Sequence, residues 1–247
     1  MLTVKGIVIR ERPLKDNDKF LDILTDTMGV IEVCAKGVKK PNSKNASVAQ
    51  VYCYANFCLS EAKSGYILNS AEPIRLFYNV RLDVRQYALA SYYSELVLFT
   101  CAKEQPNSEV LRLFLNCMHF LSEETRSPEL MKAVFELRLM TEIGLTPDLL
   151  GCKVCAKYSD KRMQFDLQGG KLYCETCCGS RDLYNFVLID DTMLHILRYI
   201  ALSDLPKLFT FKISDTYLDN LSSITERYVS IQLGKNFKTL DFYRSII

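Results

Sequence analysis

The residues of this sequence with the clearest chemistry are four cysteines in two Cys-x-x-Cys pairs, Cys152 with Cys155 and Cys174 with Cys177. Eighteen residues separate the two pairs, a spacing typical of a single zinc site held by four thiolates. A two-residue gap lets both sulfurs of a pair bind one ion, and two such pairs complete the tetrahedron that zinc prefers. Because protein fills all four positions, no site remains for an activated water, so the pattern predicts a structural zinc.

Other uses of these cysteines are less consistent with the sequence. Disulfides need an oxidising compartment, and nothing in the sequence suggests export. A thioredoxin-like redox site usually has one Cys-x-x-Cys at a helix start, whereas this chain has two. Unliganded thiols are the remaining alternative. Cys178 is an alternative to Cys177 as the fourth ligand, although a Cys-x-x-x-Cys spacing fits the turn less well.

Composition indicates a folded protein of one large domain or two or three small ones. The chain has 247 residues, of which 49% are hydrophobic and 24% are charged, so a sizeable core is expected. The N-terminus lacks the basic start and apolar run of a signal peptide, and Glu95 interrupts the longest apolar stretch. Ten cysteines without an export signal suggest a reducing interior. We expect a cytoplasmic protein with no membrane association.

The net charge of +2 does not by itself indicate a nucleic-acid-binding protein. Its distribution is more informative, because residues 81–150 are acidic and both flanking parts are mildly basic. Within residues 36–44 four lysines occur with no acidic residue. This lysine-rich loop, which we define by Lys36, Lys39, Lys40 and Lys44, is a local basic patch.

The first 75 or so residues alternate short apolar, β-branched runs with turn residues, a pattern that predicts a small barrel or sandwich. A loop over residues 37–47, rich in Lys, Asn and Ser, connects the third run to the fourth. The five expected strands are residues 4–9, 20–25, 30–35, 51–59 and 66–69.

From residue 81 the apolar residues recur with helical spacing. Ser127 followed by Pro128 is a typical helix start, and Asp190 with Asp191 is expected to cap a later helix. The expected helices cover residues 82–97, 110–121, 128–143, 191–201 and 214–233, and the four-cysteine module lies within them at 151–179.

Two sets of residues together resemble a known family. The first consists of residues 6–9, the turn at 15–19, residues 24–25 with Gly29, and the run Ala-Lys-Gly-Val-Lys-Lys at 35–40 with Ser43. The second consists of residues 151–155, Phe165, the glycines at 169–170 and residues 174–177. In order and spacing they resemble the RecO family of bacterial recombination-mediator and DNA repair proteins. Two positions depart from it, because Lys153 and Ala156 stand where zinc-bearing relatives often have proline and glycine.

The resemblance implies an α+β protein with two parts. An N-terminal five-stranded OB-fold barrel over about residues 1–78 would bind single-stranded DNA, and a mainly helical domain over about 79–247 would carry the zinc. It also implies strand annealing and, with the partner RecR, assistance in loading RecA onto gapped DNA. Further implied partners are the acidic C-terminal tail of the single-stranded-DNA-binding protein and, through DNA, the bacterial nucleoid.

An OB-fold barrel binds single strands by combining a cationic groove with aromatic rings that stack on bases. The lysine-rich loop would supply phosphate contacts, and Arg10 and Lys19, near strand ends, could extend the groove. Odd-numbered residues of 51–59 are apolar, which places Tyr52 and Tyr54 on the opposite face, where a base could stack. The alternative is a solvated loop and two tyrosines that cover the sheet.

Catalytic patterns are absent from the sequence, so we do not expect an enzyme. The two histidines, His119 and His195, sit in helical segments and are expected to be packing or boundary residues, and no phosphate-binding Gly-x-x-x-x-Gly-Lys loop occurs. A zinc-dependent hydrolase would need an open coordination position. The main alternative function is a zinc-ribbon adaptor that binds only proteins.

Overall fold

The computed structural model describes residues 1–63, 65–102, 105–179 and 184–246. The chain forms two compact units. Unit 1 consists of residues 1–125 and 237–247, and unit 2 consists of residues 126–236. The change from strands to helices occurs after residue 76, well inside unit 1, so several helices belong to the same unit as the N-terminal strands.

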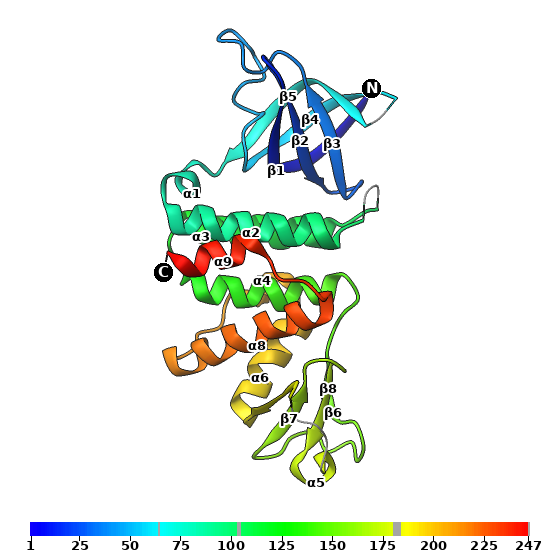
Figure 1. The fold of residues 1–247 in the computed structure, drawn as a ribbon, viewed down its shortest axis with the longest axis vertical. Coiled ribbons are helices and arrows are strands. Elements are labelled where there is room, and N and C mark those ends of the chain that lie inside the picture. The colour runs from blue at the N-terminus through cyan, green and yellow to red at the C-terminus, as the bar shows by residue number, and fades with distance from the viewer. Residues whose placement is uncertain (64, 103–104, 180–183, 247) are drawn as a thin grey trace. The chain divides into compact units, whose positions relative to one another are not determined.

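Unit 1 contains the closed five-stranded barrel that the sequence predicts (Figure 1). The strand order around the barrel is β1-β2-β3-β5-β4, with β1 pairing antiparallel to both β2 and β4, and β3 pairing parallel to β5. The strands are β1 (Leu2–Lys15), β2 (Asp18–Thr25), β3 (Val30–Ala35), β4 (Cys53–Glu61) and β5 (Tyr66–Leu76).

The barrel core follows the expected alternation of side chains. In β4 the residues from Cys53 to Leu59 alternate between buried and partly exposed, with Phe57 at the centre of the core. Gly6 lets β1 approach β2 closely, because a Cβ at this position would lie 2.7 Å from Ile23 Cγ2 and from the Leu24 carbonyl oxygen. The sequence analysis therefore assigned the inward face of this strand correctly from Cys53 onward.

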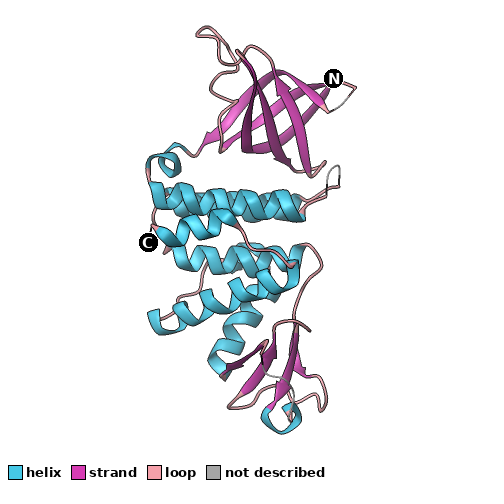
Figure 2. Cartoon of the chain, in the orientation of Figure 1, coloured by secondary structure: helices cyan, strands magenta, loops and turns pink. Residues whose placement is uncertain are grey.

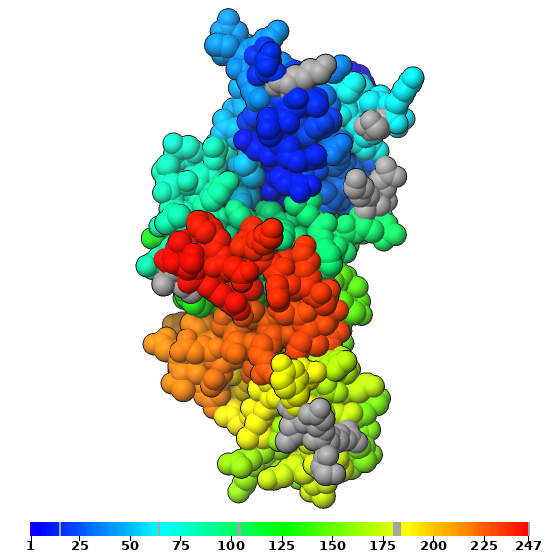
Figure 3. All heavy atoms as spheres, viewed as in Figure 1, coloured from blue at the N-terminus to red at the C-terminus, as the bar shows by residue number. Residues whose placement is uncertain are grey.

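The helices of unit 1 are α1 (Tyr78–Leu82), α2 (Val84–Thr100), α3 (Ser108–Ser122) and α9 (Lys238–Ser245). The sequence analysis did not anticipate α9, which packs against α2 (Figure 3, red). Phe237, which precedes α9, makes edge contacts with the rings of Tyr92 and Phe99 at centroid distances of 5.8 Å. The Glu95 carboxylate accepts hydrogen bonds from the backbone amide and hydroxyl of Thr239 at 3.2 and 2.6 Å. These contacts fix α9 to α2 and so complete unit 1.

Unit 2 combines helices with a small sheet that the sequence analysis did not predict (Figure 2). Its helices are α4 (Pro128–Glu142), α5 (Glu175–Cys178), α6 (Asp191–Leu202), α7 (Leu205–Leu208) and α8 (Asp215–Leu233). Its strands are β6 (Asp148–Cys152), β7 (Met163–Asp166), β8 (Lys171–Cys174) and β9 (Phe186–Ile189), in the order β6-β8-β7-β9.

Both predicted helix caps are confirmed. Ser127 accepts a hydrogen bond from the Leu130 amide at 3.2 Å, and Asp190 accepts one from the Met193 amide at 2.8 Å. In the described part of the chain, no helix has both the length and the apolar character needed to cross a membrane.

A buried ionic cluster joins α4 to α8 in unit 2. The Lys132 ammonium lies 3.0 Å from carboxylate oxygens of both Glu136 and Glu226, and Lys132 and Glu136 are 3% and 0% exposed. The Thr225 hydroxyl donates to Glu136 at 2.7 Å. One ammonium therefore faces two carboxylates, and the buried Glu136 carboxylate loses this ion pair if Lys132 is removed.

Replacing Lys132 with alanine is expected to destabilise the protein strongly. The substitution removes the ammonium that pairs with Glu136 and Glu226, and breaking a buried ion pair costs about 3 kcal/mol or more. The measurement is urea unfolding followed by circular dichroism. Arg112→Ala is the control, because it removes an exposed pair with Glu109 and should change the free energy of unfolding by less than about 1 kcal/mol. Equal effects of the two variants would contradict the assignment of the cluster as buried and charged.

Candidate metal centre and nucleic-acid interface

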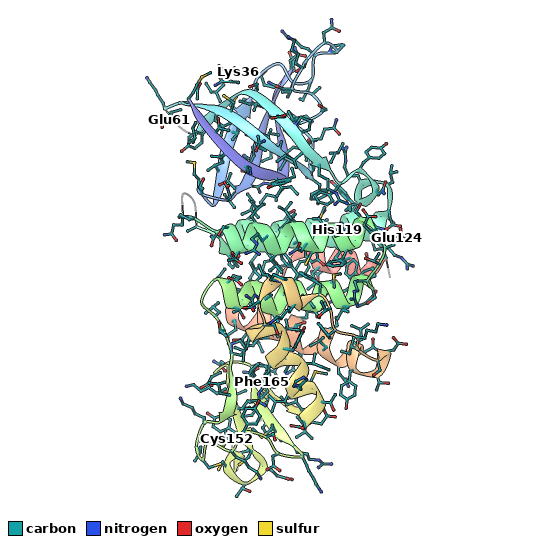
Figure 4. All side chains as sticks on the ribbon, turned by 180° about the vertical axis from the view of Figure 1, so that it is seen from behind. Lys36, Glu61, His119, Glu124, Cys152 and Phe165 are labelled. Atoms are coloured by element: carbon teal, nitrogen blue, oxygen red, sulfur yellow. The ribbon has the colours of Figure 1, made fainter. Side chains whose placement is uncertain are left out.

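The small sheet of unit 2 brings the four predicted cysteines together. Cys152 ends β6 and Cys174 ends β8, and these two strands pair with each other. Cys155 lies in the turn after β6, and Cys177 lies in α5 immediately after β8. All four sulfur atoms lie within 4.8 Å of one another (Figure 4 labels Cys152). The Cys155 and Cys174 sulfurs are 3.7 Å apart, close to the value of about 3.8 Å expected when a tetrahedral zinc binds each sulfur at 2.3 Å.

The local backbone favours a thiolate at Cys152. Burial raises the pKa of the Cys152 thiol, but hydrogen bonds from backbone amides, that of Cys155 foremost, outweigh it and lower this pKa to about 6. Hydrogen bonds with Cys174 and Cys155 raise the pKa of Cys177 to about 12. Four thiols this close cannot all ionise without a cation between them, so the donor set fits a divalent metal that takes sulfur ligands, as zinc does.

The structure places Cys177, and not Cys178, in the four-sulfur cluster. Cys178 is buried, at 6% exposure, and its sulfur is not part of the group. Ala156, which stands where zinc-bearing relatives of the resembled family often have glycine, affects the local backbone. Its φ angle is +59°, in the left-handed region that favours glycine, and its amide donates to the Cys152 carbonyl at 2.8 Å. The first turn therefore forms with alanine at a strained position.

The lysine-rich loop lies between β3 and β4 and is fixed by buried residues. Val38 and Val48 belong to the barrel core, while the four lysines are exposed (Figure 4 labels Lys36). The Gly37 amide donates to the Asp18 carboxylate at 2.7 Å, and the Lys39 amide donates to the Asn17 carbonyl at 3.1 Å. The loop is thus attached to the turn between β1 and β2, and its four lysine residues are exposed.

The predicted exposed position of Tyr52 is wrong. Tyr52 is only 1% exposed, and its φ angle of +65° interrupts the strand alternation one residue before β4 begins. Its ring packs edge-on against Tyr87 at 5.9 Å, and its hydroxyl lies 3.3 Å from the Ser91 hydroxyl. A ring enclosed between the barrel and α2 cannot stack on a base. Tyr54 lies on the outer face of β4, partly exposed, where the alternation predicts it, so base stacking by Tyr54 stays a prediction.

Arg10 and Lys19 both lie in ion pairs on the outer surface of β1 and β2. The Arg10 guanidinium is 2.6 Å from Asp22, and the Lys19 ammonium is 3.0 Å from Glu11. A phosphate would have to compete with these carboxylates. Their role in DNA binding stays a prediction, and the geometry favours the lysine-rich loop over them.

The structure clarifies the surroundings of the two histidines. His119 on α3 lies 3.1 Å from an Arg75 guanidinium nitrogen and 3.9 Å from Glu123, which fits a boundary residue (Figure 4). His195 is exposed on α6 and lines a cavity in unit 2, a position that fits a boundary residue and not a packed core residue.

Sequence reasoning missed one further feature, a run of exposed apolar side chains at the junction of β5 with α1 and α2. The run occupies residues 74–87, and no periodic pattern marks it because it spans a strand end and two helix starts. Its exposed members are Ile74, Leu76, Tyr78, Leu82, Val84 and Tyr87.

Comparison with known proteins covers almost the whole chain. The family profile described as Recombination protein O N terminal matches residues 1–77, and that described as Recombination protein O C terminal matches residues 81–241. The chain is similar to the DNA repair protein RecO of Acetivibrio thermocellus, with 31% identity covering 99% of this chain and 97% of the relative. It is also similar to the proteins of the same name from Alkaliphilus metalliredigens, with 28% identity over 100% of both chains, and Clostridium perfringens, with 27% identity over 98% of this chain and 96% of the relative.

Substitution of Cys155 by serine is expected to weaken zinc binding, so that the purified protein retains less than stoichiometric zinc, and to lower the thermal unfolding midpoint. A structural zinc contributes directly to folding free energy, and three thiolates hold it less tightly than four. Metal analysis of the purified protein and differential scanning calorimetry test this. Cys178→Ser is the matched control and should retain stoichiometric zinc. Zinc lost from Cys178→Ser but retained by Cys177→Ser would reverse the assignment of the fourth ligand.

Proposed function

Because the chain belongs to the recombination protein O (RecO) family of DNA repair proteins, we propose that it binds single-stranded DNA through the barrel of unit 1 and anneals complementary strands. The observation that carries this proposal is the lysine-rich loop, whose four exposed lysine residues occur in nine residues without a carboxylate. Small barrels of this kind bind single strands when a cationic edge follows the sugar-phosphate backbone.

The mechanism is electrostatic. Each lysine that contacts a phosphate releases condensed counterions, so binding is favoured by entropy and weakens as salt rises. Neutralised strands repel each other less, and two complementary strands held on protein meet more often than free strands do. The partly exposed ring of Tyr54 on the outer face of β4 would add a sequence-independent stacking contact. No step requires a catalytic residue or nucleotide hydrolysis.

The proposal extends to the partners that the family resemblance implies. RecR, RecA-loading on gapped DNA and the acidic tail of the single-stranded-DNA-binding protein would connect this chain to recombination. The exposed apolar run at residues 74–87 supports a protein contact on unit 1, because soluble proteins rarely expose several large apolar side chains together without a partner. The zinc-binding module would hold the sheet of unit 2 in one geometry.

That same apolar run favours a second candidate function, an adaptor that binds only proteins through unit 1. Salt dependence separates the two functions, since an adaptor does not bind DNA at any ionic strength.

The triple substitution Lys36/Lys39/Lys40→Glu is expected to abolish salt-sensitive annealing. It replaces three phosphate contacts with repulsion, so annealing of labelled complementary oligonucleotides without ATP should fall at least about a hundredfold at low salt. In the wild type, the rate should drop steeply across a salt series.

The matched control is Lys5/Arg112/Lys238→Glu, at exposed positions elsewhere in unit 1. Like the triple substitution in the loop, it lowers the net charge of the chain from +2 to −4. It should retain most of the annealing activity. Equal loss of annealing in both variants would mean that net charge, and not the lysine-rich loop, controls annealing. Absence of DNA binding by the wild type would contradict the proposed function and favour the adaptor.

A further inference from the structure

Unit 2 contains two adjoining cavities that no sequence motif indicated. The larger has a volume of about 760 Å³ and lies between α6, residues 158–159 and the start of α8. The smaller has a volume of about 330 Å³ and lies between β9, residues 161–162 and α8. Both volumes fall in the range of ligand-binding pockets. Tyr217 of α8 lines both, so the two cavities share a wall.

Aromatic rings line the larger cavity. Tyr158, Tyr199, Phe211 and Tyr217 come from four different segments of unit 2. The Tyr158 ring lies with its centroid 3.9 Å from the Arg198 guanidinium carbon and is nevertheless 64% exposed. One face of this ring is therefore supported by a cation and the rest is open to solvent.

The support beneath Tyr158 is fixed in place. The Arg198 guanidinium is buried and donates to the carbonyl of Leu149 at 2.7 Å and to that of Leu150 at 3.1 Å. Both carbonyls belong to β6, the strand that ends at Cys152. A rigid ring with an open face is the arrangement on which a flat aromatic ligand stacks at little cost in conformational entropy.

Cations line the smaller cavity. Lys161, Arg162 and Arg227 are exposed there, and the only carboxylate among the described lining residues is Asp190. Asp190 is already bonded, because it accepts from the Tyr217 hydroxyl at 2.6 Å and from the Met193 amide at 2.8 Å. Three cations against one engaged carboxylate leave a site that attracts anions.

We propose that the two cavities form a second site for single-stranded nucleic acid, in which bases stack in the larger cavity and phosphates bind the cations of the smaller one. Aromatic platforms beside a cationic track are the combination by which proteins hold single strands without reading their sequence. The site lies in unit 2, apart from the lysine-rich loop, and its role in annealing rests on the proposed function. One chain with two strand sites raises the local concentration of one strand near the other.

The larger cavity favours nucleic acid over an acidic peptide. Its lining includes the carboxylate of Asp191 near His195, two groups that accept hydrogen bonds from the amino groups of bases. Lys212 in the same lining would attract phosphates and peptide carboxylates alike, so charge does not separate the two ligands. The aromatic lining does, because a base stacks its flat face on a ring and an acidic side chain has no such face.

Photocrosslinking of a single-stranded oligonucleotide that carries halogenated uracil tests this site in the full-length protein. We expect crosslinks on peptides that contain Tyr158, Tyr199 or Tyr217, and these should persist in Lys36/Lys39/Lys40→Glu. The substitution Arg162→Glu/Arg227→Glu should reduce them by at least about tenfold and lower the slope of log affinity against log salt by about two. Tyr158→Ala should weaken crosslinking by about tenfold through loss of stacking.

Lys207→Glu is the control, because Lys207 is exposed on α7 and lines neither cavity. It should crosslink like the wild type, and the double variant should unfold at the same temperature as this control. Crosslinks confined to unit 1 would overturn the second site and leave the proposed function intact. Failure of the wild type to crosslink anywhere would overturn both. Binding of an aspartate-rich peptide to unit 2, together with no DNA crosslinks there, would assign the cavities to a protein partner and overturn the inference.

Discussion

The architecture of unit 1 depends on the pairing of one strand, β1, along both of its edges. β1 pairs with β2 on one side and with β4 on the other, and the short parallel pairing of β3 with β5 closes the barrel. The close approach at Gly6 allows β1 to pass near Ile23 and Leu24 without displacing them. Closure leaves no free sheet edge and places the connection between β3 and β4 at one end of the barrel. The exposed lysines of that connection owe their position to this closure.

In unit 2, strand pairing in the small sheet positions the residues of the metal centre. A Cys-x-x-Cys pair is local, but the meeting of two such pairs requires β6 to lie beside β8. The same strand β6 carries the carbonyls that hold Arg198, and Arg198 supports Tyr158. The metal-binding residues and the aromatic cavity therefore depend on a shared strand.

The sequence predicted those features whose causes are local. The side-chain alternation of residues 53–59, the Ser127 cap and the spacing of the cysteines each depend on neighbours within a few residues. Tyr52 was misplaced because a left-handed backbone ended the alternation, and the contacts that hold this conformation, the ring of Tyr87 and the backbone hydrogen bonds to Val8 and Phe77, come from residues far away in sequence. The sheet of unit 2 has four- and five-residue strands, too short to show a period. The two cavities have linings that are far apart in sequence, so only tertiary structure brings them together.

The position of α9 bears on how the protein is made. Residues 237–247 belong to unit 1, yet they are synthesised after the whole of residues 126–236. Until those residues are made, the surface of α2 that Phe237 and Thr239 contact stays uncovered, so the packing of unit 1 is completed only after the segment inserted into it has been synthesised. Unit 1, which contains the barrel, therefore draws on two segments of the chain separated by the whole of unit 2. Residues 126–236 thus form an insertion between α3 and α9 of unit 1.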